Sequence, residues 1–124
     1  MTILRVPAEP THEVGATRFT SLVTPSRGAA ETSIWYVEMP AGTTATPHSL
    51  TREEVFVVLE GVATVSIDGH GGKAFAGDAI VVPSGETLEL SNLSSDPVRL
   101  MCCLPVGGQA CTPGRPPFVP PWAM

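Results

Sequence analysis

Basic residues are scarce in this sequence, and they do not cluster. The 124 residues include seven Lys and Arg against twelve Asp and Glu, which gives a formal net charge of −5. Proteins that bind nucleic acid carry a basic patch or stripe, and no run of Lys or Arg here could form one. We therefore expect no nucleic-acid partner, and we relate the mild acidity to solubility.

Long apolar runs are also absent. No stretch approaches the roughly eighteen apolar residues of a membrane span. The first residues, MTILRVPAEPTHE, hold no apolar segment followed by a small-residue cleavage site, as a secretory signal would. We expect a soluble, cytoplasmic protein with no membrane partner.

Cysteine is limited to Cys102, Cys103 and Cys111. The number is odd, two of the three are adjacent, and their spacing matches no zinc-binding pattern. These features argue against a disulfide framework. We interpret the cysteines as small buried hydrophobic residues.

Helical periodicity is missing as well, because no window of ten or more residues shows it without an intervening Gly or Pro. Instead, 13 prolines and 12 glycines separate short runs rich in β-forming residues. Such runs predict a single all-β domain, either a sandwich or a barrel. The expected strands are residues 17–24, 33–39, 54–60, 62–68, 77–82, 87–92 and 98–105.

The last segment, VGGQACTPGRPPFVPPWAM, differs from the rest by its high proline content. Proline cannot donate a hydrogen bond to a central ladder, so the segment should run extended. We expect a barrel over residues 1–105 and a tail over residues 106–124. The tail should be ordered and packed on the barrel or on a partner subunit through Phe118 and Trp122.

A first gapped motif lies in the middle of the chain. Gly42 is followed after five residues by His48, then by Leu50 two positions later, by Glu54, and after six further residues by Gly61. This spacing matches the pattern G-x5-H-x-H-x3–4-E-x6-G, with leucine in place of the second histidine.

A second motif follows at residues 77–92. Gly77, Pro83, Gly85, Leu88 and Asn92 match the pattern G-x5-P-x-G-x2-H-x3-N, again with leucine in place of histidine. With both motifs in order, the chain resembles a small single-domain cupin. The resemblance implies an all-β double-stranded β-helix, a jelly-roll barrel, with the two motifs inside it.

The resemblance also implies a metal ion bound by three histidines and one glutamate. Only His48 and Glu54 match that set, because Leu50 and Leu88 occupy the other two positions. Catalytic zinc sites usually use three protein ligands, so we expect no tightly bound metal cofactor. Two possibilities stay open from the sequence: weak binding of a divalent metal at His48 and Glu54, and a third metal ligand supplied by Cys102 or Cys103.

His48 and Glu54 are the candidate catalytic residues. Burial raises the pKa of a carboxyl group and lowers that of an imidazole, whereas a hydrogen bond between them favours the charged pair. Such a pair in an apolar pocket can transfer protons near neutral pH. The alternative is an inherited pair, hydrogen-bonded to each other, in a core that binds an apolar ligand or nothing.

The residues around this pair are the candidates for substrate binding. Side chains alternate along a strand, so Leu50 should face inward with His48, and one of Trp35 and Tyr36 should face the cavity. The same holds for Cys102 and Cys103. The expected substrate-binding residues are Leu50, Leu88, Phe56, Trp35, Tyr36 and Cys103.

Three functions remain from the sequence. The first is a metal-independent enzyme of secondary metabolism, an isomerase, cyclase, dehydratase or decarboxylase acting on a small organic molecule in the barrel. The second is a ligand-binding or sensing module without catalysis, and the third is a metal-dependent, dioxygenase-like enzyme with a reduced ligand set. The run VFVVLE is apolar on both faces, which predicts a homodimer.

Overall fold

Strands account for almost all of the regular structure in the computed structural model, which describes residues 1–124. The larger sheet has six strands in the order β1-β2-β3-β10-β5-β8. Their bounds are β1 His12–Val14, β2 Thr17–Val23, β3 Thr32–Met39, β10 Val98–Pro105, β5 Glu54–Glu60 and β8 Ala79–Val82.

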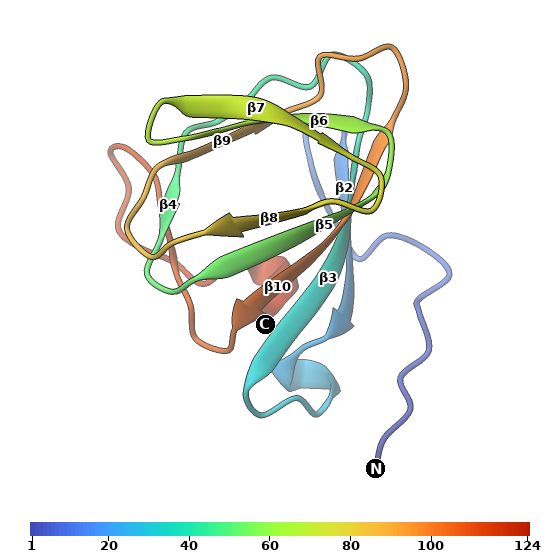
Figure 1. The fold of residues 1–124 in the computed structure, drawn as a ribbon. Coiled ribbons are helices and arrows are strands. Elements are labelled where there is room, and N and C mark those ends of the chain that lie inside the picture. Colours follow the sequence, from blue (N-terminus) through green and yellow to red (C-terminus); the bar gives the residue numbers. More distant parts are fainter.

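A three-stranded sheet, β7-β6-β9, lies across from part of the larger sheet, and the two face each other like the walls of a barrel (Figure 1). A two-stranded ladder, β11-β4, stands at one side. The bounds are β6 Val62–Ile67, β7 His70–Phe75, β9 Leu88–Ser91, β4 Ser49–Leu50 and β11 Ala110–Cys111. The only helical elements are the 3-10 turns η1 Pro25–Arg27 and η2 Pro121–Ala123. The predicted all-β jelly-roll architecture is confirmed.

The alternation of side chains along the central strands divides them into an inner and an outer face. In β3, Trp35, Val37 and Met39 are buried, whereas Tyr36 and Glu38 between them are only half-buried. The neighbouring strand β10 alternates in the same way. Seventeen buried apolar residues form one core cluster, contributed by both sheets, the β11-β4 ladder and η2.

Two tight turns depend on backbone that glycine favours. Ile67 pairs with His70, so the β6–β7 hairpin has a two-residue loop, Asp68-Gly69, in which both residues have positive φ. This is the behaviour that Asp-Gly predicts for a hairpin. At Gly61 φ is +83°, and an added Cβ would lie 2.5 Å from the Pro97 carbonyl oxygen, so only glycine fits there.

Residues 106–124 return from the end of β10 to the barrel. The backbones of Ala110 and Phe118 bond to each other at 2.7 and 3.1 Å, and the Trp122 ring stacks on Phe19 with centroids 3.7 Å apart. The Ser21 hydroxyl donates to the Trp122 carbonyl at 2.7 Å, and the Ser33 hydroxyl donates to the Ala123 carbonyl at 2.8 Å. Neither 3-10 turn has the length and apolar character needed to cross a bilayer.

Candidate functional site

A cavity of about 760 Å³ lies against the inner face of the larger sheet, and Leu90 of the three-stranded sheet also lines it. Its walls come from β3 and β5, from the β1–β2 turn, from the loop between β3 and β4, and from residues 110–122. Small-molecule sites in proteins are mostly apolar concavities of roughly 300–1,000 Å³ with a few polar groups. This cavity has that size and that character.

Glu54 lies at the first position of β5, with its side chain on the inner face beside Phe56. The residue is only 3% exposed, and its carboxyl Oε1 is buried without a hydrogen-bond partner. Burial raises the pKa of Glu54 to about 8. The carboxyl group is therefore mostly protonated at neutral pH, and a change of one or two pH units or a bound ligand can shift it between its two forms.

His48 lies just before β4, is half-buried and also lines the cavity. Its Nδ1 is 3.0 Å from the carbonyl oxygen of Thr46. A carbonyl oxygen can only accept, so Nδ1 carries a proton and the neutral ring presents Nε2 as an acceptor. His48 can then receive a proton at Nε2 without moving.

No hydrogen bond or ion pair joins His48 to Glu54. The one ion pair in the structure is Arg99–Glu60, at 3.0 Å on the outer surface. The hydrogen-bonded pair that the sequence allowed is thus not formed, although His48, just before β4, and Glu54, at the start of β5, line the same cavity. Each can contact a ligand separately.

The apolar residues predicted around this pair divide into two groups. Leu50, Phe56 and Trp35 line the cavity together with His48 and Glu54. Leu88 differs from the expectation, since it is fully buried in the core and contributes nothing to the cavity wall.

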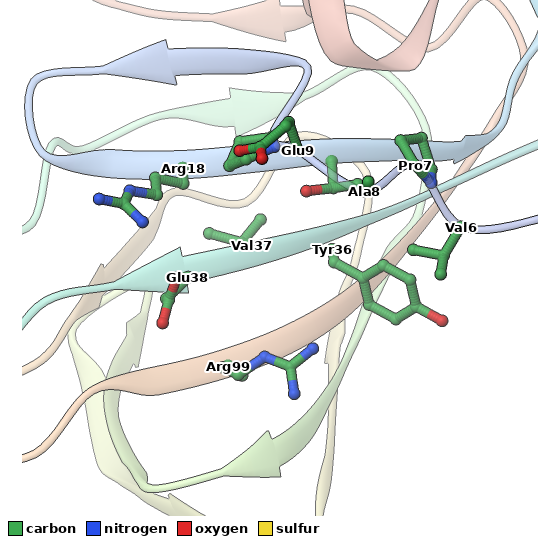
Figure 2. Close-up of a pocket in the computed structure, with 11 residues that line it drawn as sticks. Val6, Pro7, Ala8, Glu9, Arg18, Tyr36, Val37, Glu38 and Arg99 are labelled. Carbon is green, nitrogen blue, oxygen red and sulfur yellow. The ribbon is translucent and has the colours of Figure 1, made fainter.

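Tyr36 and Cys103 also differ from the expectation, because both lie on the outer face. Cys103 pairs with Ile34 and Val55, the outward residues of the adjacent strands, whereas Cys102 pairs with Trp35 and Phe56 and is fully buried. Tyr36 instead lines a small outer pocket of about 170 Å³ between β3 and the N-terminal segment. Figure 2 shows its ring beside Val6 in that pocket.

The sequence did not predict that the C-terminal segment forms part of the cavity wall. Phe118 and Trp122, marked from the sequence as packing anchors, and Arg115, not marked at all, line the wall. A proline-rich run carries no signal for such a role. The position of Arg115 depends on a contact with the Phe118 ring, over whose centroid its guanidinium carbon lies at 3.7 Å.

The residues present do not fit the four-ligand metal centre that the motifs imply. Nowhere do three or more His, Cys, Asp or Glu side chains group so that they could hold a metal ion. His48 and Glu54 offer two donors, and the other two motif positions carry isobutyl groups. Nothing in this donor set completes a metal coordination shell.

A family model, the Cupin_2 cupin domain, matches residues 35–104, more than half of the chain. The chain belongs to this family. The cupin architecture predicted from the two motifs is confirmed, and both motifs lie within the matched residues.

One curated relative shares sequence with this cupin. It is an uncharacterized protein, MJ1618, of Methanocaldococcus jannaschii, 27% identical over 66 residues. The match covers 52% of this chain, and the chain spans about half, 53%, of the relative.

Solved structures resemble the cupin more completely. The polyketide cyclase RemF of Streptomyces resistomycificus has a TM-score of 0.73 at 20% identity, over 95% of this chain and 82% of its own. Salicylate 1,2-dioxygenase of Pseudoaminobacter salicylatoxidans has a TM-score of 0.70 at 20% identity, over 86% of this chain and 31% of its own. At these identities the likeness shows the fold alone.

Proposed function

We propose that this cupin is an enzyme that binds a small, mostly apolar organic molecule in its barrel and transfers protons through Glu54 and His48. The observation that carries the proposal is the Glu54 carboxyl group, which is buried at the cavity wall without a partner. Leaving a buried polar group unsatisfied is costly, and such groups cluster where function requires them. A ligand oxygen would supply the missing partner.

Proton transfer follows from the two environments. Protonated Glu54 can donate to a carbonyl oxygen of the bound molecule, while His48 Nε2 removes a proton from the neighbouring carbon. The carbonyl becomes an enol, Glu54 becomes a carboxylate and His48 becomes an imidazolium. His48 then donates its proton to a different carbon of the enol while the enol O–H proton returns to Glu54, which gives an isomer and restores both residues.

The same chemistry supports cyclisation. A carbonyl group that accepts a hydrogen bond from Glu54 becomes more electrophilic, and an enol formed in the same cavity can attack it. The fold shared with a polyketide cyclase is compatible with this reaction. Isomerisation and cyclisation are therefore the two reactions we propose first, ahead of dehydration and decarboxylation.

The decisive experiment starts with protein purified from its own host. Small molecules extracted from it should be identified by mass spectrometry and then incubated with wild-type protein and the Glu54→Gln variant. We expect wild type to convert the molecule, and Glu54→Gln to bind it but turn it over about 100-fold more slowly. Equal binding with no conversion by either protein would indicate a ligand-binding module and overturn catalysis.

We also propose a homodimer formed through the outer face of the larger sheet. Two outward rows cross its central strands, and their members are apolar and half-buried or exposed. One row is Val81, Val55, Cys103 and Ile34, and the other is Ala79, Val57, Met101 and Tyr36. A second copy would cover this surface as a second layer.

A further inference from the structure

Arg115 is the one Lys or Arg side chain that lines the barrel cavity. It is exposed, whereas Glu54 is buried, so the guanidinium lies at the rim and the carboxyl group lies inside. No carboxylate pairs with Arg115, because the structure's one ion pair is formed elsewhere by Arg99 and Glu60. The cavity thus has a positive charge at its entrance with no protein partner.

The backbone and a ring contact hold Arg115 in this place. Its N–H donates to the Thr112 carbonyl at 3.3 Å, and Gly114 before it adopts φ +73°. Its guanidinium stacks over Phe118, whose backbone is bonded to Ala110. Stacking uses the face of the guanidinium and leaves the N–H donors at its edge free, which is the geometry that binds a carboxylate through two parallel bonds.

The charge of the cavity favours an anion. Glu54 is the only acidic side chain on the wall, and in its protonated form it adds no negative charge. Arg115 therefore gives the cavity a net positive charge in a chain whose formal net charge is −5. Beyond the rim the wall is apolar and aromatic, with Trp35 and Phe56 near Glu54.

We propose that the ligand of this cavity is an organic acid, with its carboxylate on Arg115 at the rim and its apolar body inside the barrel toward Glu54. The inference names the substrate class of the proposed enzyme and rests on that proposed function. It makes Arg115 a residue that determines specificity, not one that reacts.

Two probes of nearly equal shape test it. 2-Naphthoate carries a carboxylate, and 2-naphthamide is its neutral counterpart; binding of each is measured by calorimetric titration at pH 7. Wild type should bind the naphthoate more tightly. Arg115→Gln should weaken naphthoate binding about tenfold or more, the effect of one charge-assisted pair, and change amide binding less than about twofold.

Three comparisons sharpen the result. Arg115→Lys should recover part of the naphthoate affinity, because it keeps the charge but loses the planar fork. Arg5→Gln, which removes the same charge from an exposed position outside the cavity, should leave both affinities unchanged. Added salt should weaken binding of the naphthoate more than binding of the amide.

The outcomes separate this inference from the proposed function. If wild type binds both probes equally, or if Arg115→Gln weakens both by the same factor, Arg115 does not select acids, although the cavity still binds apolar molecules. If wild type binds neither probe, the cavity is not a binding site for such molecules, and both proposals are overturned.

Discussion

His48 and Leu88 are hydrogen-bonded partners across two antiparallel segments. The N–H of His48 donates to the Leu88 carbonyl at 3.0 Å, and the N–H of Leu88 donates to the His48 carbonyl at 2.7 Å. Residues paired in this way have Cα atoms about 5.5 Å apart and side chains on the same face. Leu50, two residues beyond His48, faces the same way. The two leucines thus stand beside the imidazole at the motif positions that would carry histidine.

This relationship predicts that the double substitution Leu50→His and Leu88→His creates a metal site. Two new imidazoles would join His48 and Glu54 to give four donors, enough for a complete or nearly complete first shell. Without metal, each change buries a polar ring in place of an isobutyl group and should cost about 1–3 kcal/mol. Zn²⁺ or Ni²⁺ at 100 times its Kd should then return about 2.7 kcal/mol.

Calorimetric titration of the folded double variant checks this prediction. The two single variants are the controls, and each should bind more weakly because one donor is missing. If the double variant binds Zn²⁺ no better than wild type, then residues 50 and 88 do not face His48 as described.

The buried carboxyl group of Glu54 predicts a pH dependence of stability. Its pKa is about 8 in the folded chain against an ordinary 4.5, so the folded state holds the proton more tightly than the unfolded state. The stabilisation is complete below pH 4.5 and is lost as pH rises to 8, by up to about 5 kcal/mol. Urea unfolding of wild type and Glu54→Gln at several pH values between 5 and 8 measures it.

Wild type should lose stability relative to Glu54→Gln steadily as pH rises across that range. Glu53→Gln is the matched control, because Glu53 is the exposed neighbour of Glu54 and its replacement should produce no such slope. A constant difference between wild type and Glu54→Gln would mean that burial does not hold the proton on Glu54.

The C-terminal segment should stabilise the barrel through Trp122. Its ring stacks on Phe19, and its backbone carbonyl accepts the Ser21 hydroxyl. Because the side chain is only partly buried, Trp122→Ala should cost about 2–3 kcal/mol, below the range for a fully buried Trp. Thermal unfolding compares it with Leu93→Ala, an exposed leucine that should cost less than about 0.5 kcal/mol. An equal loss of stability from the two substitutions would mean that the C-terminal segment does not stabilise the barrel through Trp122.

Self-association through the outer sheet face can be tested with Val81→Arg. Val81 is exposed, 53%, and pairs with Val55 in the adjacent strand. Light scattering should give twice the chain mass for wild type at micromolar concentration and the chain mass for the variant, because a buried unpaired charge opposes association. A monomeric wild type would overturn the proposed dimer.

The fold could be predicted because its signals are local. Each expected strand overlaps an observed one, and the Asp68-Gly69 turn behaves as its sequence implies. Strand β7 was not predicted, since its sequence, HGGKAF, is rich in glycine and almost wholly exposed. It exists because all six of its residues pair with β6.

The site could be predicted only in part. The direction in which a side chain points, and the side chains that it contacts, depend on packing between segments that are distant in the sequence. Alternation shows that one of Trp35 and Tyr36 points inward, but the pairing of β3 with β10 and β2 decides which one. The spacing from His48 to Glu54 likewise does not reveal that no hydrogen bond joins the two side chains. The position of Arg115 depends on packing between side chains of an irregular segment. Such a segment has no periodic sequence pattern from which this packing could be predicted.

The central claim is that Glu54 is a buried, protonated carboxyl group that faces a ligand cavity, and NMR of ¹³C-labelled glutamate carboxyl groups tests it most directly. A titration from pH 3 to 10 follows each carboxyl signal, and Glu54→Gln assigns the signal that disappears. We predict that this signal titrates near pH 8 and shifts when a ligand enters the barrel. A midpoint near the ordinary value of 4.5 would contradict the account.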